Sequence, residues 1–238
     1  MKVSQMPYEH IPLEELKSGM ESIIAGVRSA KTVEEVLAQR ERYLKLNTRL
    51  RTASSLCEIR YTCNTADEYY VAEHDYFDQI GPEIGNLDNE YGRALLEHPL
   101  RSQLEEALSP VYFRYLEVQS KAMSPEIVED MIEENQLTSE YSKLMAGLEF
   151  EFRGEKLSRA ALAAYFKDDD RETRKEAYTV FGHGMNAVAP QLDDIFDRMV
   201  KVRTRMAKKM GYDSFTQLGY YRMNRVCYGQ KEVETFRR

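Results

Sequence analysis

The stretch LEELKSGMESIIAGVRS, residues 13–29, decides the fold class of this chain. Its large apolar residues are spaced three or four positions apart: Leu16, Met20, Ile23, Ile24 and Val27. Because an α-helix has a period of about 3.6 residues, this spacing places them on one face of a helix. The stretch therefore predicts an amphipathic helix with one buried stripe, and the same period recurs along most of the sequence.

The next helix has a clear start signal. Thr32 and Glu35 stand three residues apart in TVEE, which is the spacing of a capping box. In that arrangement each side chain accepts a hydrogen bond from a backbone N–H that the first helical turn leaves unpaired. We expect this helix to run to about Cys63, with its basic middle, RERYLKLNTRLR, forming a solvated face.

Two prolines predict further helix boundaries. Proline has no backbone N–H, and its ring clashes with the carbonyl four residues earlier. We therefore expect residues 67–98 to form one or two helices, interrupted around Pro82. Pro190 is expected to begin a separate helix of residues 190–210, after one of residues 170–187.

One segment alternates with a period of two, as a β-strand does. In LEFEFRGEKLS, residues 148–158, apolar and charged residues alternate up to Gly154. This pattern predicts one short hairpin, near residues 148–157. Because the helical period dominates elsewhere, we expect an all-α fold: an elongated multi-helix lobe with that single hairpin.

Composition limits the classes of function. The chain has 238 residues, of which 42% are hydrophobic, enough for one large domain or two small ones with a buried core. Its net charge of −7 argues against nucleic acid as a partner, because a nucleic-acid binder must neutralise phosphates. No apolar stretch approaches the roughly 20 residues needed to span a bilayer, and the start lacks the features of an export signal. We therefore expect no membrane partner and a cytoplasmic location.

The sequence offers no familiar catalytic motif. His10, His74, His98 and His183 are each followed by a residue other than glutamate, so no H-E-x-x-H zinc helix is present. The stretch GHGMNA, residues 182–187, formally matches a dinucleotide fingerprint, but no strand precedes it. The three cysteines, Cys57, Cys63 and Cys227, form no C-x-x-C pair, and we interpret them as buried small hydrophobic residues. We expect no catalytic residue and no metal ligand in this chain.

Tyrosine is over-used: the chain has 16 tyrosines and no tryptophan. A tyrosine ring is rigid and apolar, and its hydroxyl can hydrogen-bond a peptide backbone, so the wall of a binding groove is one interpretation. Core packing in a large helical domain is the other. The best candidates for substrate binding lie within nine residues near the end of the sequence: Tyr220, Tyr221, Arg222, Asn224, Arg225 and Tyr228.

Three blocks of sequence follow one another at a distinctive spacing. They are EYSKLMAGLEFEFRGEKLS (residues 140–158), DDDRETRKEAYTVF (168–181) and KVRTRMAKKMGYDSFTQLGYYRMNR (201–225). Together they resemble the oligoendopeptidase F branch of the thimet-type (M3) zinc metallopeptidases. The resemblance covers essentially the whole chain, and its last block is the most specific.

The resemblance implies a cytoplasmic, mostly α-helical enzyme that cuts short peptides in a channel between two helical lobes. In such enzymes an H-E-x-x-H helix and a downstream glutamate hold zinc, and the glutamate of the motif activates the zinc-bound water. This sequence resembles only the N-terminal part of the family and lacks that helix. No zinc ligand or general base therefore transfers to any position here.

The resemblance also predicts an organisation. Residues 1–187 would form a helical N-terminal lobe, and residues 188–238 would begin the peptidase domain. The chain would supply one wall of the peptide channel, bind no zinc itself and be inactive alone, with short peptides and a C-terminal catalytic half as partners. The alternative is a self-sufficient helical scaffold that binds a peptide or protein without catalysis.

The last segment carries one more expectation. Phe215, Leu218 and Tyr221 have apolar groups that the sequence ahead of them does not obviously cover. Together with the helix that begins at Gln230, these groups are not expected to be covered in full by the lone chain. We therefore expect residues 208–238 to be its most mobile or aggregation-prone part and to become ordered against a C-terminal half; the alternative is that the segment folds back and is satisfied internally.

Overall fold

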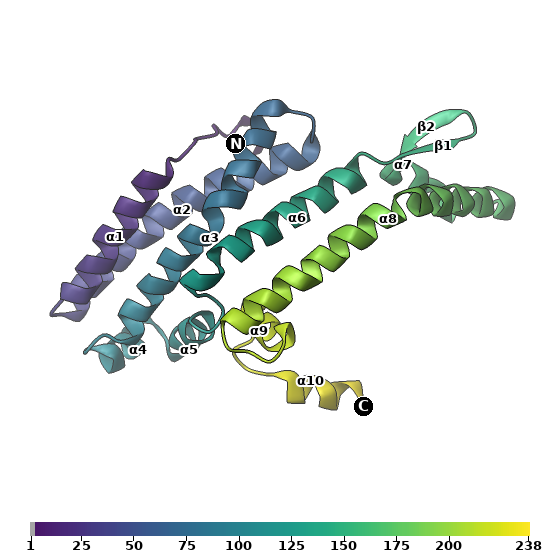
Figure 1. Ribbon diagram of the computed structural model, residues 1–238. Coiled ribbons are helices and arrows are strands. Elements are labelled where there is room, and N and C mark those ends of the chain that lie inside the picture. Colours follow the sequence, from purple (N-terminus) through teal and green to yellow (C-terminus); the bar gives the residue numbers. More distant parts are fainter. Residues whose placement is uncertain (1–2) are drawn as a thin grey trace. The chain divides into compact units, whose positions relative to one another are not determined.

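The computed structural model describes residues 3–238, and within them the chain is α-helical except for one hairpin (Figure 1). The helices in order are α1 (Leu13–Ser29), α2 (Val33–Cys63), α3 (Glu68–Leu96), α4 (Arg101–Leu108), α5 (Pro110–Gln119), α6 (Val128–Ala146), α7 (Arg159–Ala163), α8 (Arg171–Lys209), α9 (Phe215–Arg222) and α10 (Gln230–Arg237). The strands are β1 (Glu149–Phe152) and β2 (Glu155–Ser158), and short 3-10 turns lie at Val3–Gln5, Pro125–Ile127 and Ala164–Lys167. The expected all-α fold with one hairpin is confirmed.

The chain divides into two compact units. The first contains the residues up to Ile132 together with Arg203–Arg238, and the second is Glu133–Val202. Two helices, α6 and α8, contribute residues to both units. The division that we expected between residues 187 and 188 concerns function and stays a prediction.

The core of the first unit forms where α1, α2 and α3 pack side by side (Figure 1). The whole predicted stripe of α1 is buried, at 3% exposure or less, which confirms the helical period. The large side chains that it meets include Val36, Tyr91, Leu95, Leu104 and Phe113. Full burial of one such apolar side chain contributes roughly 1.5–3 kcal/mol relative to exposure, so this cluster holds the unit together.

The predicted start of α2 is also confirmed. The Thr32 hydroxyl oxygen accepts a hydrogen bond from the Glu35 N–H at 3.2 Å. The Glu35 carboxylate in turn accepts one from the Thr32 N–H at 3.3 Å. The helix ends at Cys63, as expected. The expectation that all three cysteines are buried is wrong, because Cys57 is buried but Cys63 and Cys227 are exposed.

The expected interruption of the third helical segment is wrong. The structure has one continuous helix, α3, with Pro82 inside it. Pro82 is buried beside Ile80 and Ile84, which belong to the apolar cluster around Ile11. The packing of this helix face therefore compensates for the single backbone hydrogen bond that proline removes.

The hairpin of the second unit is an antiparallel pair with a two-residue turn. Phe150 pairs with Leu157, and Phe152 with Glu155. The turn residues Arg153 and Gly154 have φ angles of 54° and 84°, and positive φ at both positions is the signature of a type I′ turn. The two phenylalanines are 2% exposed and pack against a cluster that includes Leu162 and Ala177.

A second proline prediction is also wrong, because Pro190 lies inside α8 and does not begin a new helix. The helix has 39 residues, so the loss of one hydrogen bond leaves long helical segments on both sides. Its axis changes direction along its length in Figure 1. An internal proline is a common cause of such a bend.

The end of α8 positions α9, the helix on which the predicted site begins. Gly211 has a φ of 78°, and the Tyr212 N–H reaches back to the carbonyl of Ala207 at 2.9 Å. This is the glycine-terminated helix end that closes off free carbonyls. Met206 and Ala207 then pack with Leu218 of α9 in a buried cluster. None of the helices within residues 3–238 combines the length and apolar character needed to cross a bilayer.

Candidate functional site

The six predicted substrate-binding residues lie on α9 and in the turn before α10. Tyr220, Tyr221 and Arg222 form the end of α9, and Asn224 follows with a φ of 55°. Asparagine tolerates this left-handed conformation better than most residues, so the chain can reverse here. The Asn224 N–H bonds the Tyr221 carbonyl at 2.9 Å, which closes the helix.

Three of the six residues form one cluster around a guanidinium. The Arg225 guanidinium lies 4.6 Å from the centre of the Tyr220 ring and 5.1 Å from the centre of the Tyr228 ring. These are cation–π distances, so the two rings hold the charge between them. Tyr228 is 50% exposed, which leaves one face of the cluster open to solvent.

Tyr221 points into a different environment. Its ring centre is 5.7 Å from that of Tyr212, and the Lys121 ammonium lies 5.6 Å from it. The Tyr212 hydroxyl donates to the Lys121 carbonyl at 2.7 Å, so the loop between α8 and α9 is tied to the turn after α5. Burial, with the neighbouring Tyr221 phenol as a second cause, raises the pKa of Tyr212.

Arg222 contacts the Phe215 ring of α9, and Asn224 contacts Gln119 of α5. The Arg222 guanidinium lies 5.8 Å from the centre of the Phe215 ring, and Arg203 lies over the same ring at 5.2 Å. The Asn224 side-chain oxygen accepts a hydrogen bond from the Gln119 amide of α5. The structure thus brings Tyr220, Arg225 and Tyr228 together and distributes the other three residues over neighbouring contacts.

Two residues of this region could not be found from the sequence. Gln119 and Lys121 lie about 100 positions before the residues that they contact, and a single sequence contains no signal that joins segments so far apart. Their types are ordinary for a helix end. Only the folding of α5 against α9 makes them neighbours.

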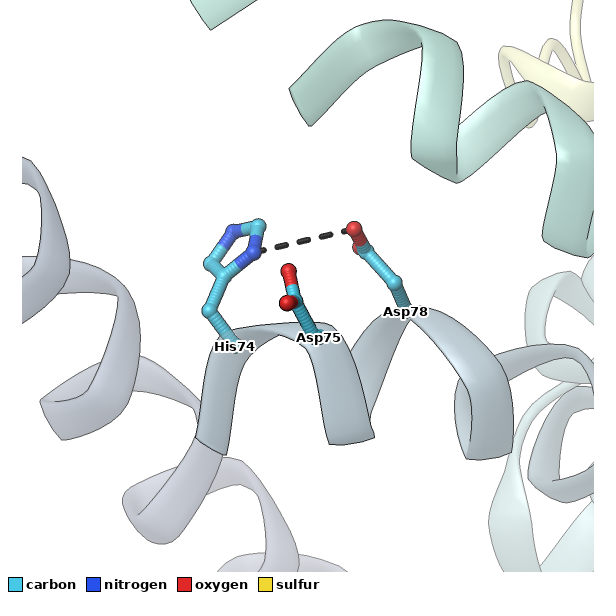
Figure 2. A group of neighbouring side chains, drawn as sticks. All are labelled: His74, Asp75 and Asp78. Carbon is cyan, nitrogen blue, oxygen red and sulfur yellow. Dashed lines mark ion pairs between the residues drawn. The ribbon is translucent and has the colours of Figure 1, made fainter. Parts of the chain in front are cut away.

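The zinc of the resembled family raises the question of whether any residues here could hold it. Within the described part of the chain, one group of potential ligands has its donor atoms within 4.8 Å of one another: His74, Asp75 and Asp78. Figure 2 shows them on one turn of α3, with the His74 ring facing Asp78. The His74 Nδ1 atom is 3.6 Å from a carboxylate oxygen of Asp78.

These residues do not fit the catalytic zinc. That site uses two histidines one helical turn apart, and Asp78 stands where the second histidine would be. The second ring nitrogen of His74, Nε2, is 3.1 Å from the Glu58 carboxylate, and Asp75 and Asp78 have further interaction partners. With the ring stacked on Tyr61 at 4.0 Å, the group is a histidine held among carboxylates. No catalytic step is assigned to it.

Comparison with known proteins places the chain in a family. The Peptidase M3 N-terminal domain matches residues 3–123. Among the curated proteins, none matches the chain.

Solved structures match over almost the whole chain. One, assigned as an oligoendopeptidase F, is 34% identical with a TM-score of 0.97, and the match covers 100% of this chain and 42% of that one. PZ peptidase A with an inhibitor is 37% identical with a TM-score of 0.96, over 99% of this chain and 42% of that one. A third, assigned as an oligoendopeptidase F from Bacillus anthracis str. Ames, is 32% identical with a TM-score of 0.95, over 98% and 43%.

The chain therefore spans less than half the length of these relatives, and it aligns with them from one end to the other. The resemblance that we drew from the three sequence blocks is confirmed by both comparisons. With the family match extending over half of its residues, the chain belongs to the Peptidase M3 N-terminal domain family.

Proposed function

We propose that this chain is the N-terminal part of a zinc-dependent oligoendopeptidase that hydrolyses short peptides in the cytoplasm. It supplies a wall of the substrate channel and is not catalytic alone. The observation that carries the proposal is the match in full to oligoendopeptidase F structures that are more than twice as long. Residues 188–238 are then the beginning of the peptidase domain, and the zinc-binding helix lies outside this chain.

The catalytic chemistry belongs to the part of the enzyme that this chain lacks. Bound zinc polarises a peptide carbonyl and lowers the pKa of its bound water. The residues of this chain contribute by positioning the peptide. The exposed cluster of Tyr220, Arg225 and Tyr228 suits that role, because its rings can cover apolar side chains while the guanidinium donates to peptide carbonyls or a terminal carboxylate.

Complementation tests the proposal directly. The chain would be co-expressed with the C-terminal part of PZ peptidase A, beginning where the alignment to this chain ends. We expect a stable complex that cleaves a quenched fluorescent peptide and loses activity with a chelator, while neither part cleaves it alone. A complex that forms but shows no chelator-sensitive cleavage would contradict the proposed enzyme.

The wall residues have their own test in the same complex. Arg225→Met is expected to raise the KM for short peptides several-fold with little change in kcat, because a positioning contact is lost while the catalytic groups remain. Arg28→Met is the matched control, since Arg28 is exposed at the end of α1 and lies outside the cluster. If the chain instead binds peptides tightly with no partner present, the alternative of a self-sufficient scaffold is favoured.

A further inference from the structure

A cavity of about 370 Å³ lies inside the first unit, between α2, α3 and α5. Its size falls in the range of small-molecule sites. One stripe of α2 lines it at helical spacing: Arg40, Tyr43, Asn47 and Arg51. Asp88 and Tyr91 of α3 and Tyr112 of α5 add further polar groups to the wall, and we call this cavity the tyrosine pocket.

The pocket contains a buried donor without a well-formed hydrogen bond. Tyr91 is 1% exposed, and its hydroxyl makes no hydrogen bond of acceptable geometry within the described residues, although the Tyr112 phenol lies close enough to act on it. The ring cannot easily turn away, because it stacks on Tyr43 with centroids 4.1 Å apart and planes inclined by 10°. Most buried side-chain polar atoms in proteins are hydrogen-bonded. The exception, at a cavity wall, indicates an acceptor supplied by a ligand.

The charge that lines the pocket is positive. Within the described residues, Arg40 and Arg51 form no ion pair, and the Arg40 guanidinium lies 5.6 Å from the centre of the Tyr112 ring, which holds it at the wall. Asp88 is the carboxylate of the pocket. Two guanidinium groups against one carboxylate leave a net charge of about +1, so the pocket best accommodates a monoanion.

Another part of the pocket wall offers a hydrogen-bond acceptor. Asn47 donates to the Tyr43 hydroxyl at 3.1 Å, and that hydroxyl donates to an Asp88 oxygen at 3.2 Å. Asp88 makes no other hydrogen bond within residues 3–238, so its second oxygen can accept one from a ligand. Asp88 would also repel a dianion such as phosphate. The pocket therefore offers donors for an anionic group and an acceptor for a hydrogen-bond donor, and one ligand can carry both groups.

We propose that the tyrosine pocket binds a small organic monocarboxylate that carries a hydrogen-bond donor. The carboxylate lies between the Arg40 guanidinium and the Tyr91 hydroxyl, and the donor of the ligand reaches Asp88. Guanidinium and phenol donors both suit a carboxylate, and the tyrosine rings cover the apolar body of the ligand. This site is separate from the cluster around Arg225 and does not depend on the proposed peptidase function.

N-acetyl-L-alanine is a suitable probe, because it has one carboxylate, one amide N–H and a small apolar body. Titration into the full chain would be followed by NMR chemical shifts and by calorimetry. We expect saturable binding with shifts centred on residues of α2, α3 and α5. The uncharged N-acetyl-L-alanine amide tests the carboxylate, and inorganic phosphate tests a general anion site.

Two variants test the assigned contacts. Tyr91→Phe removes only the phenol hydroxyl, so it should weaken binding about tenfold, as loss of a hydrogen bond to a charged group implies, while the ligand-free protein melts at the same or a higher temperature. A hydroxyl with a merely structural role would lower the melting temperature instead. Arg40→Met should weaken binding by at least as much. Arg114→Met is the matched control, because Arg114 is exposed on α5 and does not line the pocket.

The proposal is supported if the carboxylate binds and the amide does not, with both pocket variants impaired and the control unchanged. It is overturned if N-acetyl-L-alanine gives no saturable shifts, if phosphate binds as well as the carboxylate, or if Arg40→Met leaves the affinity unchanged.

Discussion

At the scale of single residues, two aspartates in the first unit have pKa values shifted in opposite directions. Burial raises the pKa of Asp88 to about 6, and the hydrogen bond from Tyr43 and the charge of Arg51 only partly offset it. Asp130 is buried as well, but Arg205 and Lys209 approach its carboxylate at 2.6 and 2.7 Å. Burial acts against ionisation there, yet these two cations prevail, and the pKa of Asp130 lies below its usual value.

The raised pKa of Asp88 predicts a stabilising substitution. The folded state holds the Asp88 proton more tightly than the unfolded state, whose pKa is 3.8, so this stability is full below pH 3.8 and is lost as the pH rises through about 6. Asp88→Asn should therefore raise the free energy of unfolding by about 1–3 kcal/mol above pH 7 and have little effect near pH 3.5. Denaturant unfolding at the two pH values measures this. The control Asp193→Asn, at an exposed position, should leave the free energy of unfolding unchanged at both pH values.

For Asp130 the same argument predicts a destabilising substitution. Its folded pKa is lowered, so its contribution is present above the unfolded value of 3.8 and is lost as the pH falls through the folded pKa. Asp130→Asn should lower the free energy of unfolding by about 1–3 kcal/mol at pH 7, because it removes the partner of two cations that are themselves partly solvated. The difference from the wild type should shrink below pH 4. An equal loss at pH 7 and pH 3 would show that packing, and not charge, explains the effect.

The sequence predicted local features at this scale and missed distant ones. The pair Thr32 and Glu35 is a local signal, because capping residues and backbone donors lie within one turn. The basic middle of α2 is exposed at Arg42 and Lys45, as expected of a solvated face, and the half-buried Arg40, Tyr43 and Asn47 also line the tyrosine pocket. The pocket also requires Asp88 and Tyr91, which contact Tyr43 but lie more than 40 positions further along the chain. The sequence alone therefore did not indicate it.

At the scale of elements, the hairpin and α8 approach each other closely at one glycine. A Cβ at Gly184 would lie 2.5 Å from a ring carbon of Phe150, which is itself buried. Gly182, two residues earlier on the same helix, has nothing within 4 Å of such a Cβ. The GHGMNA stretch therefore contains one glycine that packing requires and one that it does not.

These two positions give a matched pair of variants. Gly182→Ala should stabilise the protein by up to about 1 kcal/mol, because alanine has the higher helix propensity. Gly184→Ala gains the same propensity but forces Phe150 from its place, and overpacking of this kind costs about 1–3 kcal/mol. Thermal unfolding of both variants measures the difference. Equal stabilisation by both would mean that the hairpin moves away from α8 without penalty.

The two helix boundaries predicted at Pro82 and Pro190 are wrong for a physical reason. The rule that proline interrupts a helix considers one lost hydrogen bond and one local clash, worth roughly 3 kcal/mol. In α3, Pro82 belongs to a buried helix face together with Ile80 and Ile84. The packing of a whole helix is a tertiary contribution that local rules do not contain, and it kept α3 continuous at Pro82. Pro190 is exposed, and α8 continues through it with long helical segments on both sides. The hairpin was predicted correctly because alternation and turn residues are both local.

At the scale of the whole molecule, the last segment is only partly covered. Leu218 is covered within the chain, because its side chain is 0% exposed and packs with Met206 and Ile127. Beyond α9 the pattern changes: Met223 is 52%, Tyr228 50% and Phe236 91% exposed. The uncovered apolar surface is therefore narrower than the sequence indicated and lies in residues 223–238.

This surface predicts how the segment behaves without and with a partner. The helix α10 has eight residues, too few for a stable helix in water without tertiary contacts, and no residue of it is buried. We expect fast amide hydrogen exchange in residues 230–238 of the lone chain and slow exchange in residues 215–222, where Leu218 anchors α9. Binding of the C-terminal part of PZ peptidase A should slow exchange in residues 230–238, because burial of apolar surface stabilises by roughly 25 cal/mol per Å².

A pair of substitutions separates a docking role from general solubility. Phe236→Asp should weaken the complex at least about tenfold, since it places a charge where an apolar side chain would be buried. Val111→Asp makes the same change at another exposed apolar position, 57% exposed on α5, and should leave the complex intact. If exchange in residues 230–238 is already slow in the lone chain and the partner does not change it, then contacts within the chain order α10, and Phe236 is not part of a docking surface.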